Sequence, residues 1–409
     1  MAARQAGRVA RQCRSGVPKE LRHAIRKKSH LDLILGLAGD QKMPDNPPSK
    51  DMSMRRLIQR WTKDARAYLR GRLRFPLLRP ARRKKGRFRA PRRALASRLL
   101  LSFRAYRLYL PAAVSSRNGL PLLVMLHGCK QDAEVFAEGT RMNELAERHD
   151  FIVLYPEQSR RANPHGCWNW FDPAALTGTG EAAAIARIVR RVVKRYRVDP
   201  TRVYITGMSA GGAMACILAN RYGTLFAACA VHSGLMYHAA TSPSAALTAM
   251  RMGSSNSALK TARQPRPTSP SAAAFVPTLV IHGDRDETVN PVNADQIIEQ
   301  TRTLAEYESE PPRPLVEHAE RRVAGSHRAY QLRDYVRDGR IVLRKIIVEG
   351  LGHAWSGGDE RHSYNDSQGP DASQLIWKFL SEFRRLPGEK STGMRAWRVS
   401  LSAMWNRLS

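Results

Sequence analysis

The chain has 409 residues, a hydrophobic share of 43% and 68 Lys and Arg against 35 Asp and Glu, for a formal net charge of +33. This length is enough for one large domain or two ordinary ones, and the apolar share argues against a disordered chain. The positive charge is concentrated in residues 1–100, which hold 29 Lys and Arg against 6 Asp and Glu. It therefore says little about chemistry in the middle of the chain.

Cysteine usage and hydropathy exclude several classes of protein. The cysteines are odd in number and sparse, and none forms a Cys-x-x-Cys pair, which argues against a small disulfide framework and a zinc knuckle. No run of about 18 apolar residues is present, so no membrane-spanning helix is predicted. The basic N-terminus is not followed by an apolar segment of signal-peptide type, which leaves a cytoplasmic location as one alternative.

The two ends of the chain differ from its centre. Residues 1–100 are predicted to be a basic, largely flexible extension, with one amphipathic helix near 52–72. The segment RPARRKKGRFRAPRR at 79–93 is expected to be a solvated, mobile tether. An alternative is an arm that binds an anionic surface, with no specific nucleic acid indicated. Residues 387–409 form a short basic tail.

Between residues 101 and 386, predicted strands alternate with helices. Strands are predicted at FRAYRLYLP (103–111), LPLLVMLHG (120–128), FIVLYPEQ (151–158), RVYITG (202–207), FAACAVHSG (226–234), TLVIHG (278–283) and IVLRKIIVEG (341–350). Helices are predicted at 143–150, 180–200, 210–223, 293–305 and 371–383. This alternation predicts an α/β fold with a mainly parallel sheet, helices on both faces and a site at the carboxyl ends of the strands. The Ser/Ala/Pro-rich stretch 238–275 interrupts it and is expected to be a cap or mobile loop.

The stretch YITGMSAGG at 204–212 contains the candidate nucleophile. Ser209 lies in a G-x-S-x-G pattern between a predicted strand and a predicted helix. A sharp turn in this position exposes the serine hydroxyl, and the flanking glycines let neighbouring backbone pass closely. The alternative is a glycine-rich packing turn without chemistry.

A nucleophilic serine needs a base and an acid that orients the base. In a strand–turn–helix setting the acid follows the serine in the chain and the histidine comes last. Asp284 and Asp286 follow the strand at 278–283, and His353 follows the strand at 341–350. Asp286 is the favoured acid and Asp284 the alternative; the carboxylate that is not used would cap a loop.

Acyl transfer also needs hydrogen-bond donors for the oxyanion. The backbone N–H of Ala210, directly after the nucleophile, is one candidate, and that of Cys129 in LHGCKQ is the other. His127 in this loop is interpreted as a structural residue. The apolar surroundings of Cys216 and Cys229 predict buried core thiols.

Eight sequence blocks together resemble the poly(3-hydroxybutyrate) depolymerase-type esterases of the α/β-hydrolase fold. In order they are YRLYLP, LVMLHGCKQDA, FIVLYPEQS, CWNWF, VYITGMSAGGAMA, AVHSG, HGDRDETV and GLGHAW, and the resemblance covers about residues 103–385. The resemblance implies a serine esterase with the triad Ser209, Asp286 and His353, because the family spaces its acid as G-x-x-D-x-x-V. It implies action on poly(3-hydroxybutyrate), its oligomers, or feruloyl and acetyl esters, without a metal or organic cofactor.

Two further features are expected near the site, the first from the position of GCWNWFDP (166–173) after a strand and the second from the resemblance. Trp168 and Trp170 could form an apolar wall for the acyl chain, with Asn169 as a polar anchor; ordinary loop packing is the alternative. A disulfide between Cys129 and Cys167 is implied, and with it an extracellular location, which conflicts with the absence of a visible signal peptide.

Two other functions stay open. The hydrolase domain could be inactive and serve an anionic-surface binding protein, or it could act on other acyl groups as a peptidase or acyltransferase. No segment after residue 386 is large enough for a separate polymer-binding domain, which favours oligomers, amorphous polymer or small esters.

Overall fold

The computed structural model describes residues 86–89, 105–262, 275–307, 313–322, 327–385 and 397–399. All of them belong to the unit Arg82–Ser409. The helix expected near 52–72 and most of the basic extension lie outside the described residues, as do most residues of the C-terminal tail.

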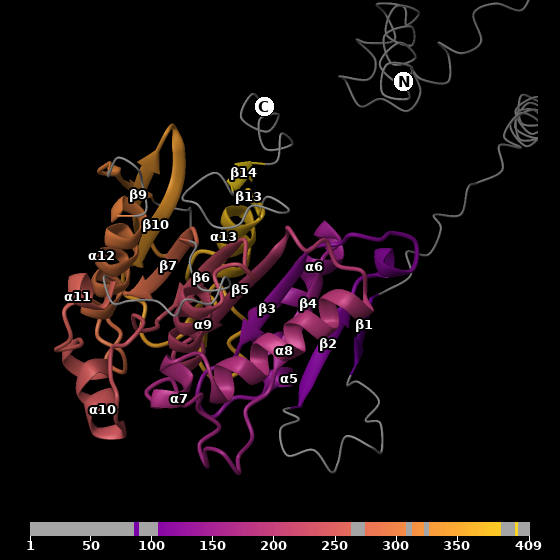
Figure 1. Ribbon diagram of the computed structural model, residues 1–409, viewed down its shortest axis with the longest axis horizontal. Coiled ribbons are helices and arrows are strands. Elements are labelled where there is room, and N and C mark those ends of the chain that lie inside the picture. Colours follow the sequence, from indigo (N-terminus) through magenta and orange to yellow (C-terminus); the bar gives the residue numbers. More distant parts are fainter. Residues whose placement is uncertain are drawn as a thin grey trace, which may run out of the picture. The chain divides into compact units, whose positions relative to one another are not determined.

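A ten-stranded mixed sheet forms the centre of this unit (Figure 1). Its order is β1-β2-β4-β3-β5-β6-β7-β10-β9-β8, and the six strands from β4 to β10 in this order run parallel to one another. Antiparallel strands flank them on both sides. The strands are β1 Arg87–Arg89, β2 Tyr106–Leu110, β3 Leu122–Leu126, β4 Ile152–Pro156, β5 Val203–Met208, β6 Ala228–His232, β7 Thr278–Gly283, β8 Val316–Arg322, β9 Tyr330–Arg337 and β10 Arg340–Val348. Two small sheets pair β11 Trp355–Ser356 with β12 Asn365–Asp366, and β13 Phe383–Arg385 with β14 Trp397–Val399.

Helices connect the parallel strands. They are α5 Ala133–Thr140, α6 Met142–His149, α7 Pro173–Leu176, α8 Gly180–Arg195, α9 Ala210–Arg221, α10 Pro243–Met252, α11 Ala258–Ala262, α12 Val292–Tyr307 and α13 Ala372–Leu380. Within the described ranges, no helix has both the length and the apolar character needed to cross a membrane.

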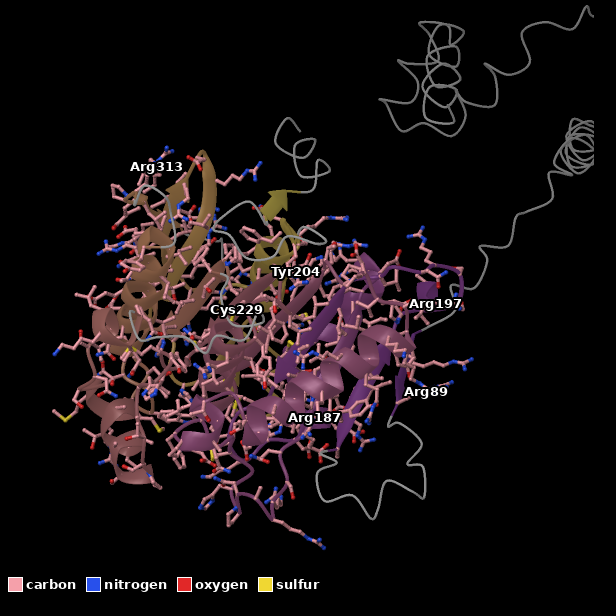
Figure 2. The ribbon with its side chains drawn as sticks, viewed as in Figure 1. Arg89, Arg187, Arg197, Tyr204, Cys229 and Arg313 are labelled. Atoms are coloured by element: carbon pink, nitrogen blue, oxygen red, sulfur yellow. A yellow bond between two sulfur atoms is a disulfide. The ribbon has the colours of Figure 1, made fainter. Side chains whose placement is uncertain are left out.

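The sheet is covered on both faces, which confirms the predicted architecture. Alternate residues of β3 enter different apolar clusters: Leu122, Val124 and Leu126 pack with α8, α9 and α12, whereas Leu123 and Met125 pack with α5, α6 and α13. The sequence of a strand that is buried on both faces is a continuous apolar run, and LLVML of β3 is such a run. In Figure 2, the exposed Arg197 and Arg313 lie at the periphery of the unit, whereas the label of Arg187 lies over helix α8.

The sheet is wider than the sequence predicted. Arg87–Arg89 form the edge strand β1 and pair with β2, so this part of the expected tether at 79–93 is instead part of the sheet. The Arg-Phe-Arg alternation explains why: Phe88 meets the ring of Tyr155 edge-on at 5.8 Å between ring centroids, while both arginines stay exposed. Strands β8 and β9 were not predicted either; all seven residues of β8 are exposed and carry no apolar pattern.

The described part of the insertion 238–275 is helical. Helices α10 and α11 are joined to α12 by side-chain hydrogen bonds, including Asn293 Nδ2 to the Ala249 carbonyl at 3.0 Å and Gln300 Nε2 to Thr261 Oγ1 at 2.6 Å. A role of this insertion as a cap stays a prediction.

Candidate active site

The candidate residues follow strands that end at the same edge of the sheet. Met208, the last residue of β5, is in register with His232 of β6, and Gly283 of β7 with Val348 of β10. Ser209, Asp286 and His353 come one, three and five residues after the ends of β5, β7 and β10. Parallel strands thus deliver all three side chains to one edge, as expected for this class of fold.

Ser209 adopts a backbone conformation that is unusual for a serine. Its φ is 57° and its ψ is −123°, directly between β5 and α9. Such strained conformations persist where the surrounding structure enforces them, and they gather at functional sites. The Ser209 N–H donates to the His232 carbonyl at 2.9 Å, which fixes the turn to the neighbouring strand.

The glycines around Ser209 allow close backbone contacts. A Cβ atom on Gly211 would lie 2.1 Å from the Leu126 carbonyl oxygen, and one on Gly207 would lie 2.4 Å from the Gly211 carbonyl oxygen. Since real Cβ atoms essentially never approach so closely, larger residues cannot occupy these positions without movement of the backbone. The strand end, the turn and the first turn of α9 therefore form one tightly packed unit.

Asp286 and His353 form a hydrogen-bonded pair. His353 Nδ1 lies 2.7 Å from Asp286 Oδ2, and the Asp286 side chain is fully buried while 11% of the His353 side chain is exposed. The other carboxylate oxygen accepts the N–H groups of Thr288 at 3.0 Å and Val289 at 2.8 Å. These bonds fix the carboxylate and direct Nε2 of His353 away from it.

A further histidine lies against the same carboxylate. His282 Nε2 is 2.7 Å from the Val289 carbonyl, to which it donates, and 3.4 Å from Asp286 Oδ2. Burial alone would raise the pKa of Asp286, but the hydrogen bonds from His282 and His353 outweigh it and hold that pKa well below its usual value. Asp286 therefore stays ionised and can stabilise a protonated His353.

Asp284 lies in a different environment. Its Oδ1 accepts the N–H of Gly350 at 2.6 Å, and its own N–H donates to the Val348 carbonyl at 3.1 Å. The residue is exposed and ties the turn after β7 to the turn after β10. This is the loop-capping position expected for the carboxylate that the site does not use.

The loop after β3 lies beside Ser209. A Cβ on Gly128 would be 3.5 Å from Ser209 Cβ, so this loop passes close to the candidate nucleophile. Ala210 is the first residue of α9, and its N–H has no carbonyl partner within the helix. The structure joins Cys129 to Cys167 in a disulfide, the pairing that the family resemblance implies.

His127 has a structural position in this loop. The ring is buried; its Nε2 accepts the Gln158 N–H at 3.1 Å, so Nδ1 carries the proton and donates to the Gly128 carbonyl at 2.8 Å. Burial lowers the pKa of His127, which keeps the ring neutral. Both nitrogens are used in shaping the loop.

The CWNW loop packs into the core. Trp168 has no exposed surface and donates from Nε1 to the His127 carbonyl at 3.1 Å, and Trp170 is 4% exposed. Asn169 is bound to Glu181, which accepts its backbone N–H and its Nδ2, each at 2.9 Å. These contacts favour the loop-packing alternative; a wall formed by Trp168 and Trp170 and an anchor at Asn169 stay predictions.

Three residues of this region were not singled out from the sequence. They are Gln131, Glu181 and His282, and all three are buried. Gln131 Oε1 accepts the Gly128 N–H at 2.9 Å, and His282 Nε2 donates to the Val289 carbonyl. Glu181 follows a glycine at the start of a predicted amphipathic helix. An acidic residue is common at a helix N-terminus, so the sequence gives no sign of another role for it. Gln131 and His282 lie inside family blocks, but a sequence carries no sign of the contacts that define their roles.

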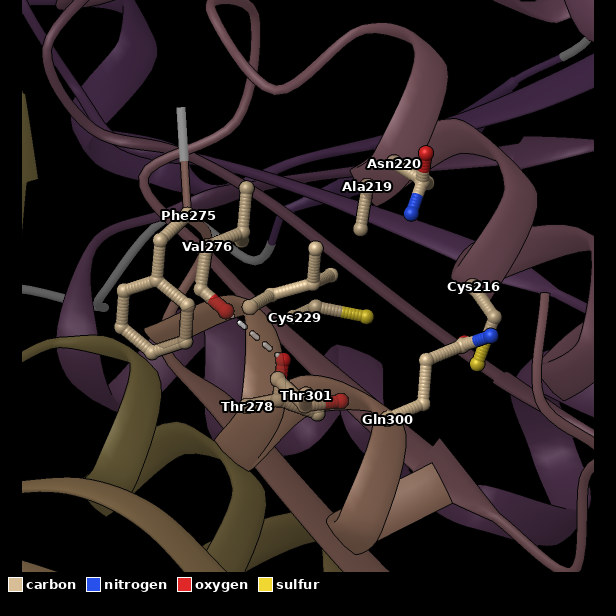
Figure 3. Close-up of a pocket in the computed structure, with 10 residues that line it drawn as sticks. Cys216, Ala219, Asn220, Cys229, Phe275, Val276, Thr278, Gln300 and Thr301 are labelled. Carbon is tan, nitrogen blue, oxygen red and sulfur yellow. Dashed lines mark hydrogen bonds between the residues drawn. The ribbon is translucent and has the colours of Figure 1, made fainter. Parts of the chain in front are cut away.

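A small pocket lies away from this edge (Figure 3). Burial raises the pKa of Cys216 to about 12 and that of Cys229 well above its usual value, so neither thiol is activated. Thr278 at the start of β7 places the pocket near the amino ends of the strands. The lining residues are Cys216, Ala219, Asn220, Cys229, Phe275, Val276, Thr278, Gln300, Thr301 and Leu304.

Comparisons with known proteins agree with this architecture. The chain is 33% identical over 236 residues to poly(3-hydroxyalkanoate) depolymerase C of Paucimonas lemoignei, an alignment that covers 57% of this chain and 54% of that protein. It is 30% identical over 219 residues to acetylxylan esterase A of Aspergillus oryzae, covering 50% of this chain and 68% of that protein. The chain thus spans about half the length of the depolymerase.

A solved structure shares the fold. Acetyl xylan esterase from Aspergillus awamori matches with a TM-score of 0.54 at 20% identity, over 68% of this chain and 94% of that one. The model of the family described as Esterase PHB depolymerase matches residues 104–310, which include the turn at Ser209, the disulfide and Asp286. This chain belongs to the esterase PHB depolymerase family.

Proposed function

We propose that this protein is a serine esterase that hydrolyses carboxylic esters through an acyl-enzyme intermediate. Ser209 is the nucleophile, His353 the general base and Asp286 the residue that orients His353. The observation that carries the proposal is the 2.7 Å contact between His353 Nδ1 and the buried Asp286, at the sheet edge that holds the strained Ser209. Family membership supports the same chemistry.

The proposed first step is acylation. With Nδ1–H donating to Asp286, the neutral imidazole has its free electron pair on Nε2, which takes the proton of Ser209 as Oγ attacks the ester carbonyl. The N–H groups of Cys129 and Ala210 donate to the oxyanion of the tetrahedral intermediate. Protonated His353 then gives its proton to the alcohol, which leaves as the carbonyl re-forms.

Deacylation repeats these steps with water in place of Ser209. His353 removes a proton from the water, the hydroxide attacks the acyl-enzyme, and the proton returns to Ser209 as the acid leaves. Asp286 stays ionised throughout, because the hydrogen bonds it accepts hold its pKa low.

We propose poly(3-hydroxybutyrate) or its oligomers as the substrate class. The similarity to a poly(3-hydroxyalkanoate) depolymerase supports this choice. Acetyl and feruloyl esters of plant polysaccharide are the second candidate, supported by similarity to acetylxylan esterase A and to feruloyl esterase B of Neurospora crassa, the latter 34% identical over 131 residues, 32% of this chain and 43% of that protein.

Hydrolysis assays on the full chain test the proposal. The wild type, Ser209→Ala and the control Ser244→Ala, an exposed serine of α10, are assayed on p-nitrophenyl acetate and butyrate, 3-hydroxybutyrate oligomers and methyl ferulate. We expect Ser209→Ala to lower kcat on the order of 10³-fold or more, with the control near the wild type. The substrate with the highest kcat/KM then selects between the two classes.

Two outcomes would contradict the proposal. Turnover by Ser209→Ala close to that of the wild type would refute the nucleophile. A folded wild type without activity on any ester would favour an inactive domain that binds an anionic surface through the basic extension.

We also propose that the protein works in an extracellular, oxidising environment. The support is the disulfide between Cys129 and Cys167, since such bonds persist outside reducing compartments. Mass spectrometry of protein alkylated without reductant should find both cysteines unmodified. Their quantitative alkylation in protein taken directly from its native source would contradict this location.

A further inference from the structure

An exposed aromatic side chain lies beside the candidate base. Tyr364 is 36% exposed, and its ring meets the His353 imidazole edge-on, with 6.3 Å between ring centroids and 79° between the ring planes. Tyr364 thus combines contact with the candidate base and access to solvent, so its ring is available to a molecule that binds beside His353.

The backbone of Tyr364 is held in a conformation that costs free energy. Its φ is 64°, in the left-handed region that a bulky residue rarely adopts. The Tyr364 carbonyl accepts the Trp355 N–H at 2.7 Å, and the next residue, Asn365, pairs with Trp355 in the β11–β12 sheet. Strain of this kind persists where the surrounding structure enforces it, and it is typical of ligand-contacting sites.

The position next to Tyr364 is tightly packed. A Cβ on Gly358 would lie 2.3 Å from Asn365 Oδ1, and one on Gly139 would lie 2.4 Å from Asn365 Nδ2. The Asn365 amide therefore fills the space between the segments that carry Gly139 and Gly358. It leaves no room for a side chain at either glycine. This packing fixes the direction in which the neighbouring Tyr364 leaves the loop.

The same loop is tied to the candidate oxyanion loop. Gln131 donates from Nε2 to the Ser363 carbonyl at 3.4 Å, while its Oε1 accepts the Gly128 N–H at 2.9 Å. Gly128 in turn approaches Ser209. One buried glutamine thus connects the segment that carries Tyr364 to the loop beside Ser209, so Tyr364 is held near both His353 and the candidate nucleophile.

The chemistry of the proposed esterase specifies which part of a substrate reaches this position. His353 must give its proton to the alcohol oxygen, so the alcohol portion of the ester is the part nearest the imidazole. The acyl carbonyl is held instead at Ser209 and the oxyanion donors. We propose that the Tyr364 ring contacts the apolar part of the leaving alcohol and sets the preference for it, an inference that rests on the esterase function proposed above.

The test separates the alcohol from the acyl portion of the substrate. One series keeps the acetyl group and changes the alcohol (methyl, butyl and benzyl acetate), and the other keeps methanol and changes the acid (methyl acetate, butyrate and benzoate). The variants are Tyr364→Asn, which removes the ring with a residue that tolerates positive φ, and Tyr364→Phe, which keeps the ring. Tyr307→Asn, at a 68% exposed tyrosine at the end of α12, is the matched control.

We expect Tyr364→Asn to lower the ratio of kcat/KM for benzyl acetate to that for methyl acetate about tenfold, because an apolar contact of this size discriminates to that degree. The ratios in the acyl series should change far less. Tyr364→Phe and Tyr307→Asn should keep the wild-type ratios.

Three results would overturn the inference. They are an unchanged alcohol ratio in Tyr364→Asn, an equal loss in both series, and a Tyr364→Phe variant that behaves like Tyr364→Asn. A wild type that hydrolyses no ester, or a Ser209→Ala variant that hydrolyses them all, would instead refute the proposed esterase. Thermal unfolding of each variant identifies any that fails to fold, and Tyr364→Gly, which removes the ring and the backbone strain together, then takes the place of Tyr364→Asn.

Discussion

Asp284 and Asp286 are two residues apart in the chain, yet their surroundings give them different roles. Asp286 is buried against two histidines and accepts two backbone N–H groups, whereas Asp284 is exposed and holds the turn at Gly350. A carboxylate can orient a histidine only when it is held rigidly and stays ionised. Asp286 meets both conditions because of its contacts.

Replacing each carboxylate by its amide should separate the two roles. Asp286→Asn keeps the shape of the side chain but removes the charge and favours the wrong tautomer of His353, so kcat should fall about 10⁴-fold. Asp284→Asn keeps an oxygen that can accept the Gly350 N–H and should stay within about threefold of the wild type. Steady-state kinetics on p-nitrophenyl acetate measure both, and a larger loss in Asp284→Asn than in Asp286→Asn would reverse the assignment.

Single residues were predictable where a motif fixes their place relative to a strand. Ser209, Asp286 and His353 each follow a strand by a few residues, and the parallel order of those strands brings them to one edge. Trp168 was not predictable in this way. An aromatic residue in a loop near a site reads the same whether it faces the substrate or, as here, the core.

At the scale of elements, the unit of β5, the Ser209 turn and α9 depends on contacts between backbone segments. Gly211 lies against the end of β3, where the Leu126 carbonyl leaves no space for a methyl group. Helix α9 can begin directly at Ala210 because its first turn is made of such small residues.

A methyl group at Gly211 should therefore disturb both stability and the site. We expect Gly211→Ala to lower the free energy of unfolding by about 1–3 kcal/mol, as overpacking does, and to lower kcat because Ser209 and the Ala210 N–H move together. Gly352→Ala is the control, since its Cβ would meet the Arg285 carbonyl at 3.9 Å, an ordinary contact. Urea unfolding of both variants gives the comparison, and equal stability of Gly211→Ala and the wild type would contradict the packing argument.

The elements themselves were predictable where burial imposes a pattern. The continuous apolar runs of β3 to β7 and the periodic helices α8, α9, α12 and α13 were all predicted, because both faces of the sheet are covered. Strand β8 was not, since its residues are held by backbone pairing with β9 and bury nothing. Strand β1 was not predicted because it lies in a basic segment and, of its three residues, Phe88 alone packs against the core.

For the whole molecule, buried histidines link folding to pH. Burial and the nearby His282 and His353 lower the pKa of His232 to about 3, although Asp286 acts in the opposite direction. The ring stacks on Trp355, and its Nε2 accepts the Ser356 N–H at 3.2 Å. Below its ordinary pKa of 6.5, the histidine of the unfolded chain binds a proton that the folded protein does not take up until about pH 3.

Stability should therefore fall as the pH is lowered from 6.5 towards 3. One proton contributes ~1.4 kcal/mol per pH unit to this slope. The lowered pKa of Asp286 adds to the loss below its ordinary value of 3.8, because its contribution is present above that value and disappears as the carboxylate is protonated. Urea unfolding between pH 7.5 and 4.5 measures how the free energy of unfolding changes with pH. This change per pH unit should be smaller for His232→Gln than for the wild type. The control His318→Gln, at an exposed histidine of β8, should behave like the wild type. Identical slopes in all three proteins would exclude His232 as a source of the pH dependence.

By itself, the sequence determined the α/β class, the order of most strands and helices, the family and the three candidate triad residues. These properties depend on apolar periodicity and on short spacings, which are local in the chain. The tertiary structure alone decided how Gln131 joins two loops separated by more than 200 residues, and that Tyr364 stands exposed beside the candidate base. Those outcomes depend on contacts between distant segments, and no local pattern encodes which side chains a folded sheet brings within hydrogen-bond distance.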